Sequence, residues 1–407
     1  MSLHRRSIIG PLVLAMSASF ALASAQPAGA SRIYHPPGNV SHASTCSARL
    51  GNSSSRINAW LAGLRTRPGD IIRLARNQCY RTDKTIVLSH KSNVTFDGNG
   101  STFASFRDRA MSRENAHFRI QDDRAVTVKN LEIVGAARGG YIARYEAQHG
   151  FHVVGNTGVT INHVSVNAVY GDFVMLQRDV NRRTPTNITI ANSRFGAGGR
   201  GGAGRQELTI DDGSNVNVRN NYFGHGHRSA VDIEPVSRGS VIRNIVIQSN
   251  TFGPNPTLWF ANHGVAATIS GIRFLNNTLE RTMAVDIVTP DGRVNRSNYQ
   301  FVGNVSRVAQ NTGNCQRGGS MTMRIIGVSS LAVRSNTQPM QAHAGNTCQY
   351  FVDGTRISGA ITSNALRNAW KVGDYDAASR VCEANNRIGP QNPPRQTAPR
   401  SRGATRC

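Results

Sequence analysis

Lysine is almost absent from this sequence, and acidic residues are scarce. Only four of the 47 basic residues are lysines, and they face 23 acidic residues, so the formal net charge is +24. A surplus of this size favours polyanionic partners through long-range attraction. Aromatic residues make up only 6% of the chain, and no nucleic-acid-binding motif is recognised, which argues against nucleic acid. An acidic extracellular polysaccharide is the expected partner, with an arginine-rich genomic composition as the alternative source of the charge.

Long apolar runs are absent beyond the N-terminus, so no membrane-spanning segment is predicted. The first 25 residues combine Arg5 and Arg6 with the uncharged stretch SIIGPLVLAMSASFALASA. A basic start, an apolar centre and a small-residue end are typical of a cleaved secretory signal. The paired arginines leave both the general secretory route and the twin-arginine route of bacteria open. We predict a secreted bacterial protein whose mature chain begins near Gln26 and keeps a charge of +22, because the signal's two arginines are its only charged side chains.

Cys-x-x-Cys pairs are also absent, which leaves little support for a zinc or redox site. The chain nevertheless has six cysteines, and an even number in an exported protein predicts disulfides. The simplest pairing joins sequence neighbours, namely Cys46 with Cys79, Cys315 with Cys348, and Cys382 with Cys407.

One sequence pattern occurs ten times. Each copy reads apolar-x-apolar, then a turn that usually contains Asn, then a second apolar-x-apolar pair, and the second residues of successive copies lie 27 to 33 positions apart. Alternation with a period of two indicates β-strands, and Asn tolerates the left-handed backbone of a sharp turn. The copies are 93–103, 125–135, 158–168, 187–197, 215–225, 244–254, 271–281, 298–308, 330–340 and, more faintly, 359–369. Short strands at this interval, with no helices between them, predict a parallel β-helix of about ten coils.

A second family of strands alternates with the first. Its members are HGFHVVG (149–155), GDFVML (171–176), QELTID (206–211), SAVDIE (229–234) and MAVDIV (283–288). The asparagines of the turns form two columns, which we expect to hydrogen-bond along the stack as internal ladders rather than to bind ligands. The first column contains Asn130, Asn192, Asn220 and Asn276, and the second contains Asn221, Asn250, Asn277, Asn304 and Asn336.

These patterns predict one folded domain with distinct ends. We assign residues 1–25 to the signal, 26–54 to an N-terminal extension, 55–380 to the β-helix and 381–407 to a Pro- and Arg-rich tail. Within 55–70, apolar residues recur at helical spacing at Ile57, Trp60, Leu61 and Leu64, which predicts a helix that caps the first coil. The tail is expected to be extended and mobile, tied back through Cys407.

The chain resembles the pectate-lyase-like superfamily. The stretch NVTFDGNGSTF (93–103) is similar to an early coil of that superfamily, and PGDIIRL (68–74) is similar to its entry strand. The resemblance covers roughly residues 55 to 370 and implies an all-β, right-handed parallel β-helix that acts on polysaccharides. No individual member family is matched, and no catalytic residue is carried over from it.

Candidate catalytic residues come from the alternation of the second strand family. If Val231 and Ile233 face the core, the residues between them must point outward. One outward column then contains His152, Met175, Thr209, Asp232 and Asp286, and the next contains Gln177, Asp211 and Glu234. Strand spacing places Asp211, Asp232 and Glu234 within roughly 5 to 8 Å of one another on an exposed face. This range covers both retaining and inverting glycosidases, and we predict these three carboxylates to be catalytic.

Cations and further polar residues near this cluster are predicted to bind substrate. They are Arg205, His225, His227, Arg228, Asp172 and Asp286. His149 and His152 are either part of the same subsites or plain surface residues. If the reaction is β-elimination, an Arg or His would take the proton at C5 while positive charge stabilises the uronate carboxylate.

The predicted function is that of a glycoside hydrolase, with a polysaccharide lyase as the less favoured enzyme, because the carboxylates are clearer than any basic catalyst. No cofactor is required, although calcium binding by the carboxylates is an alternative. A solvated ladder of carboxylates and arginines is the purely structural interpretation of the same residues. The rival function is that of a non-catalytic carbohydrate-binding or surface-adhesion protein.

Overall fold

A computed structural model gives the fold of the chain. It describes residues 30–107, 116–139, 141–196, 204–224, 226–253, 257–260, 265–281, 284–287, 294–308, 321–339, 350–367, 371–389, 396–398, 400–401 and 403–407. The chain divides into two compact units, Met1–Ser31 and Arg32–Cys407. Everything below concerns the second unit, so the signal predicted at 1–25 lies outside the described residues. Within them, no helix has the length and apolarity needed to cross a membrane.

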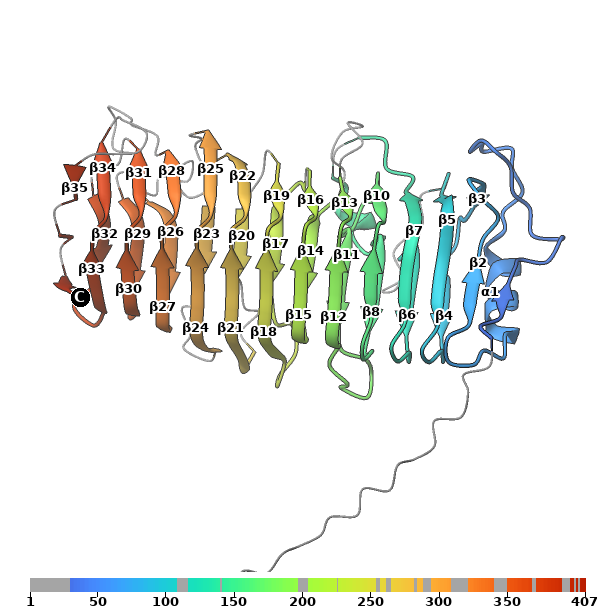
Figure 1. The fold of residues 1–407 in the computed structure, drawn as a ribbon, viewed down its shortest axis with the longest axis horizontal. Helices are drawn as coiled ribbons and strands as arrows, with labels where there is room; N and C mark the ends of the chain where they lie inside the picture. Colours follow the sequence, from blue (N-terminus) through green and yellow to red (C-terminus); the bar gives the residue numbers. More distant parts are fainter. Residues whose placement is uncertain are drawn as a thin grey trace, which may run out of the picture. The chain divides into compact units, whose positions relative to one another are not determined.

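The second unit is a stack of coils in which parallel strands follow one another in chain order (Figure 1). Each coil contributes one strand to a sheet of 11 described strands, sheet B, and then one or two strands to a sheet of 25 described strands, sheet A. The predicted right-handed parallel β-helix is confirmed. Sheet B contains β4 (Ile86–Ser89), β6 (Phe118–Gln121), β8 (Phe151–Val154), β11 (Val174–Gln177), β14 (Gln206–Ile210), β17 (Ser229–Ile233), β20 (Thr257–Phe260), β23 (Ala284–Ile287), β26 (Met321–Ile326), β29 (Tyr350–Thr355) and β32 (Lys371–Tyr375).

Sheet A wraps the rest of each coil. Its longer strands match the ten repeats, and shorter strands follow them after a turn. Sheet A contains β1 (Ile33–Tyr34), β2 (Ile71–Arg73), β3 (Cys79–Arg81), β5 (Thr95–Ala104), β7 (Thr127–Val134), β9 (Thr160–Asn162), β10 (Ser165–Asn167), β12 (Thr186–Ala191), β13 (Arg194–Phe195), β15 (Gly213–Arg219), β16 (Tyr222–Phe223), β18 (Val241–Gln248), β19 (Thr251–Phe252), β21 (Ala267–Leu275), β22 (Thr278–Arg281), β24 (Val294–Val302), β25 (Val305–Val308), β27 (Val328–Arg334), β28 (Thr337–Pro339), β30 (Ser358–Thr362), β31 (Ala365–Arg367), β33 (Arg380–Ala384), β34 (Arg387–Gly389), β35 (Gln396–Thr397) and β36 (Ala404–Arg406).

Every second residue of a strand points inward, and these inward side chains form the core. The rings of Phe195, Phe223 and Phe252 stack on successive coils, with centroids 5.3 and 4.9 Å apart, and all three side chains are buried. Stacked identical side chains satisfy the fixed spacing between coils without voids. One hydrophobic cluster therefore runs from the first coil to the last.

The second predicted asparagine column forms the expected ladder. At each rung, Oδ1 of one asparagine accepts from the backbone N–H and from Nδ2 of the asparagine one coil earlier, at 2.9 to 3.1 Å from Asn221 to Asn304. The ladder continues through Asn336 and Asn364 to Asn386. These side chains are buried, so the ladder satisfies polar groups that the turn would otherwise leave unpaired.

The first predicted column does not form an internal ladder, and that expectation is wrong. Asn130, Asn192, Asn220 and Asn276 are exposed and adopt φ angles of 52° to 56°. They supply the left-handed backbone of the turn, a conformation that Asn tolerates better than most residues, and Asn220 and Asn276 directly precede the ladder residues Asn221 and Asn277.

The N-terminal end of the stack is capped as predicted. Helix α1 (Ser54–Gly63) buries Ile57 and Leu61, while Trp60 and Leu64 pack against the edge of the core. A second short helix, η1 (Ala143–Tyr145), lies between β7 and β8. The extension before α1 contributes strand β1, which pairs in parallel with β2.

The C-terminal tail is bound to the stack more firmly than predicted. Strand β36 pairs in parallel with β33, and Cys382 and Cys407 form a disulfide. The expectation of a mobile tail is therefore wrong for Ala404–Arg406. Cys46 and Cys79 are also joined, and the pair Cys315 and Cys348 lies outside the described residues.

Candidate functional site

The outward face of sheet B carries a row of register-paired positions, which we call the central row. Thr209 on β14 pairs with Asp232 on β17, as the sequence predicted. Strand β20 was not predicted, and it places Trp259 between Asp232 and Asp286. Asp286 is therefore two strands away from Asp232. The complete row among the described strands of sheet B is Val87, Arg119, His152, Met175, Thr209, Asp232, Trp259, Asp286, Arg324, Asp353 and Asp374.

Four carboxyl groups gather around β14 and β17. Asp211 and Glu234 directly follow the register pair Ile210 and Ile233, so they are neighbours across the sheet. We call Asp172, Asp211, Asp232 and Glu234 the acid cluster.

The acid cluster is far more buried than predicted. Asp172 and Asp232 are 0% exposed and Asp211 is 2% exposed, whereas Glu234 is partly exposed. The expectation of an exposed carboxylate face is wrong for Asp211 and Asp232, because Gln177 lies against Asp211 and Gln206 lies against Asp232. Only Glu234 offers the cluster direct access to solvent.

Gln206 holds Asp232 in place. Its Nε2 donates a hydrogen bond to Oδ2 of Asp232, while Oδ1 of Asp232 has no hydrogen-bond partner among the described residues. Gln206 Oε1 in turn accepts from Nε of Arg205. A buried carboxyl oxygen without a partner is costly, and such groups are concentrated at functional sites.

Arg205 is the cation of the cluster. Its Nε lies 3.0 Å from Oδ1 of Asp172, and its Nη1 lies 3.9 Å from Glu146. Burial lowers the pKa of Arg205, but the charges of Asp172 and Asp232 more than offset this and raise it overall. Arg205 therefore stays charged and compensates part of the negative charge around it.

Electrostatics favour the protonated forms of the buried aspartates. Burial is the main cause that raises the pKa of Asp232 well above its usual value, and the charges of Glu234 and Asp172 add to it, against Arg205. Burial likewise raises the pKa of Asp211, with Asp172 and Glu234 adding to it. In glycosidases, two carboxyl groups in different surroundings have different pKa values, so that one serves as the acid and the other stays ionised. The buried Asp211 and Asp232 beside the partly exposed Glu234 resemble this arrangement.

Two histidines line the next coils. His149 Nδ1 accepts the backbone N–H of Asp172 at 3.0 Å, which places its proton on Nε2. Burial, helped by the charge of Arg205, lowers the pKa of His149 to about 3, so the ring is neutral and acts as a structural support. His152 Nε2 lies 3.2 Å from Gln177 Oε1, and Gln177 Nε2 donates to Asp211 at 3.2 Å. Neither histidine is the plain surface residue that the sequence left open, since both are buried.

Asp286 belongs to a different arrangement. Its two oxygens each accept from Arg324 at 2.8 Å in a bidentate ion pair. Asp353 and Asp374 follow in the same row. The purely structural interpretation, a ladder of carboxylates and arginine, therefore describes Asp286 and not Asp232.

The predicted loop residues form a wall beside Arg205. His227 stacks on Tyr141 with ring centroids 5.0 Å apart, and the Arg228 guanidinium lies 5.1 Å from the same ring. Tyr141 donates a hydrogen bond to Glu146, which connects this wall to Arg205. His225 lies outside the described residues.

A groove of about 760 Å³, the edge groove, adjoins the cluster on the side of Asp211. It runs along the ends of β6, β8 and β11 and is lined on one side by the chain after β11. Gln177 connects it to Asp211. Its charged lining residues are Arg119, Asp122, Arg178, Asp179, Arg183 and Asp212, three of each sign.

The sequence placed Gln177 in the outward column with Asp211 and Glu234, but it did not reveal Gln206, Glu146 or Tyr141 as parts of the site. Gln206 starts a strand that was predicted, so its position was a usable signal, but its partners depend on the register between coils. Glu146 and Tyr141 come from a connection with no repeat pattern. Within the described ranges, no group of three or more His, Cys, Asp or Glu side chains has the geometry to hold a metal ion.

Comparisons with known proteins identify the fold. No protein-family model matches the chain, and no curated protein matches it. Among solved structures, DFA-IIIase from Arthrobacter chlorophenolicus A6, without its lid and in complex with GF2, is similar over 87% of this chain and 94% of its own, at 11% identity and a TM-score of 0.57.

Two further similarities are weaker. The surface adhesin PfbA of Streptococcus pneumoniae covers 84% of this chain and 94% of its own at 11% identity, with a TM-score of 0.46. A hyperthermoactive exopolygalacturonase from Thermotoga maritima covers 88% and 92% at 10% identity, with a TM-score of 0.47. At these identities the similarity concerns the fold alone, and the parallel β-helix that the resemblance implied is confirmed.

Proposed function

We propose that the protein is a secreted glycoside hydrolase that acts on an acidic polysaccharide at the acid cluster. The observation that carries the proposal is the burial of three aspartates, Asp172, Asp211 and Asp232, around one arginine on the outward face of a sheet. Such a cluster destabilises the fold, because buried charges are expensive unless each is paired. A structural role has no need of it, as the fully paired Asp286 on the same face illustrates.

In the proposed reaction, Asp232 is the general acid and Glu234 the general base. Alternate residues of one strand are about 6.6 Å apart, a separation that suits an inverting glycosidase with water between substrate and base. Asp232 protonates the leaving glycosidic oxygen as the bond from the anomeric carbon to that oxygen breaks. Water attacks the anomeric carbon and gives its proton to Glu234, so one water is consumed for each bond cleaved.

The surroundings of Asp232 tune this pair. Burial and the charge of Glu234 help to keep Asp232 protonated, and Arg205 limits the repulsion among the carboxyls. Because Asp232 is closed to solvent in the free protein, the proposal includes displacement of the side chains that cover it when the glycan binds. Elimination is disfavoured because Arg205 is ion-paired with Asp172 and its pKa is raised, which makes it a poor proton acceptor.

Export is part of the proposal. Residues 1–25 have the order of a secretory signal, and the disulfides Cys46–Cys79 and Cys382–Cys407 suit an oxidising compartment. Substrate binding is assigned to Arg205, Asp172, His227 and Arg228, together with the edge groove.

The test is glycan cleavage by wild type, Asp232→Asn and Glu234→Gln across uronate polymers and neutral glycans. Reducing-end release reports hydrolysis, and ultraviolet absorbance of unsaturated products reports elimination. We expect hydrolysis of an acidic glycan by wild type and a loss of at least about a hundredfold in each variant. The control is Asp286→Asn, a carboxyl from the same row outside the cluster, which should retain activity. Equal cleavage by wild type and Asp232→Asn would overturn the catalytic role of Asp232, and binding without cleavage would favour a carbohydrate-binding or adhesion protein.

A further inference from the structure

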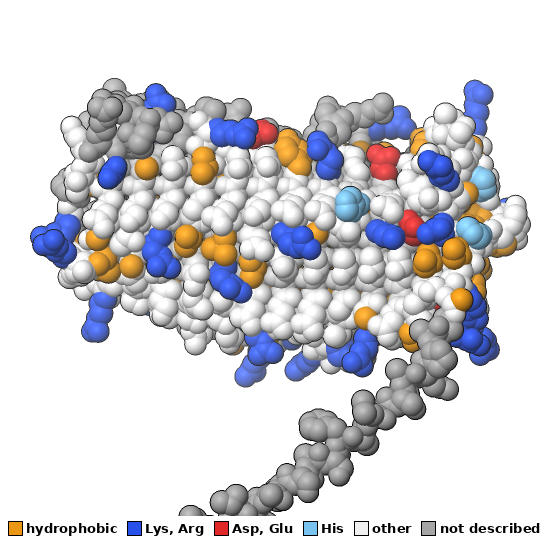
Figure 2. All heavy atoms as spheres, viewed as in Figure 1, with side chains coloured by type: hydrophobic (Ala, Val, Ile, Leu, Met, Phe, Trp, Pro, Cys, Tyr) orange, Lys and Arg blue, Asp and Glu red, His pale blue; other side chains and the backbone are white. Residues whose placement is uncertain are grey.

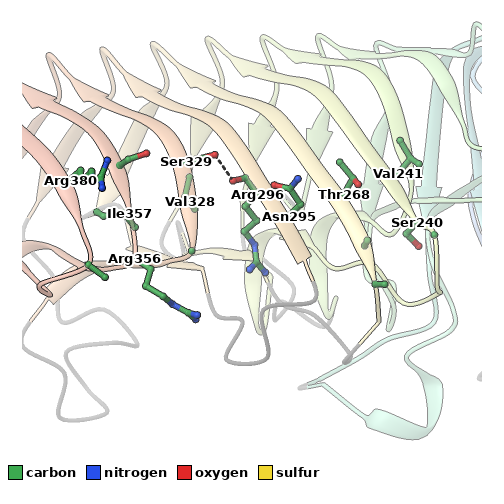
Figure 3. Close-up of a pocket in the computed structure, with 16 residues that line it drawn as sticks. Ser240, Val241, Thr268, Asn295, Arg296, Val328, Ser329, Arg356, Ile357 and Arg380 are labelled. Carbon is green, nitrogen blue, oxygen red and sulfur yellow. Dashed lines mark hydrogen bonds between the residues drawn. The ribbon is translucent and has the colours of Figure 1, made fainter.

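A second groove of about 770 Å³, the distal groove, lies along the edge of the later coils, where sheet A begins after each connection from sheet B. Figure 3 shows its labelled residues in one row across successive coils, from Ser240 and Val241 at one end to Arg380 at the other. Register pairs connect the row from β18 through β21, β24, β27 and β30 to β33. At about 4.8 Å per strand, the row is about 24 Å long.

The two grooves meet end to end. Ser240 lines the distal groove, and its Oγ donates to Oδ2 of Asp212, a residue of the edge groove, at 3.1 Å. Ser240 also lies 2.8 Å from the carbonyl of Ser237 in the edge groove. A chain bound beside Gln177 and Asp211 could therefore continue along the same edge into the distal groove.

The charge of the distal groove differs from that of the edge groove. The edge groove has three basic and three acidic lining residues, whereas among the described residues that line the distal groove, Arg296, Arg356 and Arg380 are basic and none is acidic. Arg356 and Arg380 are exposed. One carboxylate, Asp376, stands beside this end and accepts the backbone N–H of Arg356 at 3.0 Å.

The remaining lining residues suit a sugar chain. Thr268, Asn295 and Ser329 are exposed and present hydroxyl and amide groups on successive coils, which match the hydroxyls of a glycan. The rise of one coil is close to the length of one sugar unit in an extended glycan, so equivalent contacts recur along the row.

We propose that the distal groove binds the carboxylate-bearing sugars of the polysaccharide beyond the cleaved linkage. Arg356 and Arg380 would pair with carboxylates, for which guanidinium groups are well matched, and the polar row would hold the chain between them. The inference rests on the proposed function for its substrate, but it concerns binding and not cleavage. The net charge of +24 draws such a chain to the protein from a distance, and the face shown in Figure 2 carries many more basic than acidic side chains.

The test is titration calorimetry with an oligogalacturonate hexasaccharide, using the full chain with Asp232→Asn so that the probe is not consumed. In that background, Arg356→Ser with Arg380→Ser is compared with Arg334→Ser and Arg387→Ser, two exposed arginines of sheet A outside the groove. Both double variants remove the same charge. We expect roughly tenfold weaker binding in the groove variant, less than about twofold change in the control, and weaker binding of the parent as salt rises.

Four results would overturn the distal site. The first two are unchanged affinity in the groove variant and equal losses in both double variants. The other two are binding of neutral maltohexaose as tight as that of the acidic probe, and absence of any binding of the acidic probe. Thermal unfolding of each variant shows whether a loss reflects misfolding. Failure of the proposed hydrolysis is seen separately, as equal cleavage by wild type and Asp232→Asn, so the two proposals are judged by different measurements.

Discussion

Arg205 Nε lies 3.0 Å from Oδ1 of Asp172, and both side chains come from the beginnings of neighbouring coil segments on sheet B. Asp172 is 0% exposed, and burial raises its pKa, while the charge of Arg205 and a hydrogen bond from Thr209 oppose this shift. The same arginine approaches Glu146 and offsets the charge of Asp232. One cation therefore supports a cluster of carboxyls that would otherwise repel one another.

The first prediction concerns the coupling of this pair. Arg205→Gln should reduce the free energy of unfolding by about 3 to 5 kcal/mol, because it leaves Asp172 buried without its ionic partner. Asp172→Asn removes the charge that needs compensation, so the double variant should be more stable than the sum of the single losses predicts. Urea unfolding of the four proteins in a double-mutant cycle measures the coupling. Strictly additive losses would contradict the proposed dependence.

The second prediction concerns Asp123, a buried residue outside the acid cluster. Burial is the main cause that raises its pKa to about 7, against the opposing effect of Lys91, whose backbone N–H donates to Oδ1 at 2.6 Å. Because the folded pKa is higher than the unfolded one, the native state binds the proton more tightly. The stabilisation is present below pH 4 and is lost as pH rises toward 7, by about 4 kcal/mol at most.

Asp123→Asn should remove this pH dependence. The variant and wild type should have similar free energies of unfolding near pH 4, and the variant should be the more stable of the two near pH 8. Urea unfolding over this pH range is the measurement. A constant difference between the two proteins at every pH would show that Asp123 does not titrate as expected.

The third prediction concerns the asparagine ladder. Asn277 Oδ1 accepts two hydrogen bonds from Asn250, and its Nδ2 donates to Ile247 and Asn304. Asn277→Ala should cost roughly 3 to 5 kcal/mol, because it strands several buried polar groups. The matched control is Asn276→Gly at the preceding, exposed turn residue, where φ is 52° and glycine is readily accepted. Thermal unfolding should separate the two variants clearly, and equal losses would argue against the ladder as the stabilising element.

Much of the fold could be predicted because its signals repeat. The register of Leu208 with Val231 follows from the alternation of each strand, and ten similar segments fix the stacking direction. Strand β20 was not predicted, although it has two inward apolar positions, Leu258 and Phe260, as the predicted strand β23 has in Val285 and Ile287.

The candidate site could be predicted only in part. Alternation placed Asp232 outward, which is correct, but outward from a coil is not the same as exposed. Burial of Asp232 depends on Gln206, whose contact with it across strands is a tertiary interaction. Asp286 likewise differs from Asp232 because it has an arginine partner, Arg324, on the next strand of sheet B. Which residue lies next to Asp286 depends on the lengths of the connections between coils, and these connections carry no repeat pattern.

The last prediction uses Gln206 to assign the role of Asp232. Gln206 Nε2 donates to Oδ2 of Asp232, a hydrogen bond that stabilises the carboxylate form. Gln206→Leu removes it and should raise the pKa of Asp232 further, by about one unit if the bond contributes about 1.4 kcal/mol. If Asp232 is the general acid, activity falls when it loses its proton, so the alkaline limb of kcat/KM should move to higher pH while the acidic limb stays in place. A shift of the acidic limb instead would make Asp232 the base, and an unchanged profile with lower stability would reduce Gln206 to a structural contact.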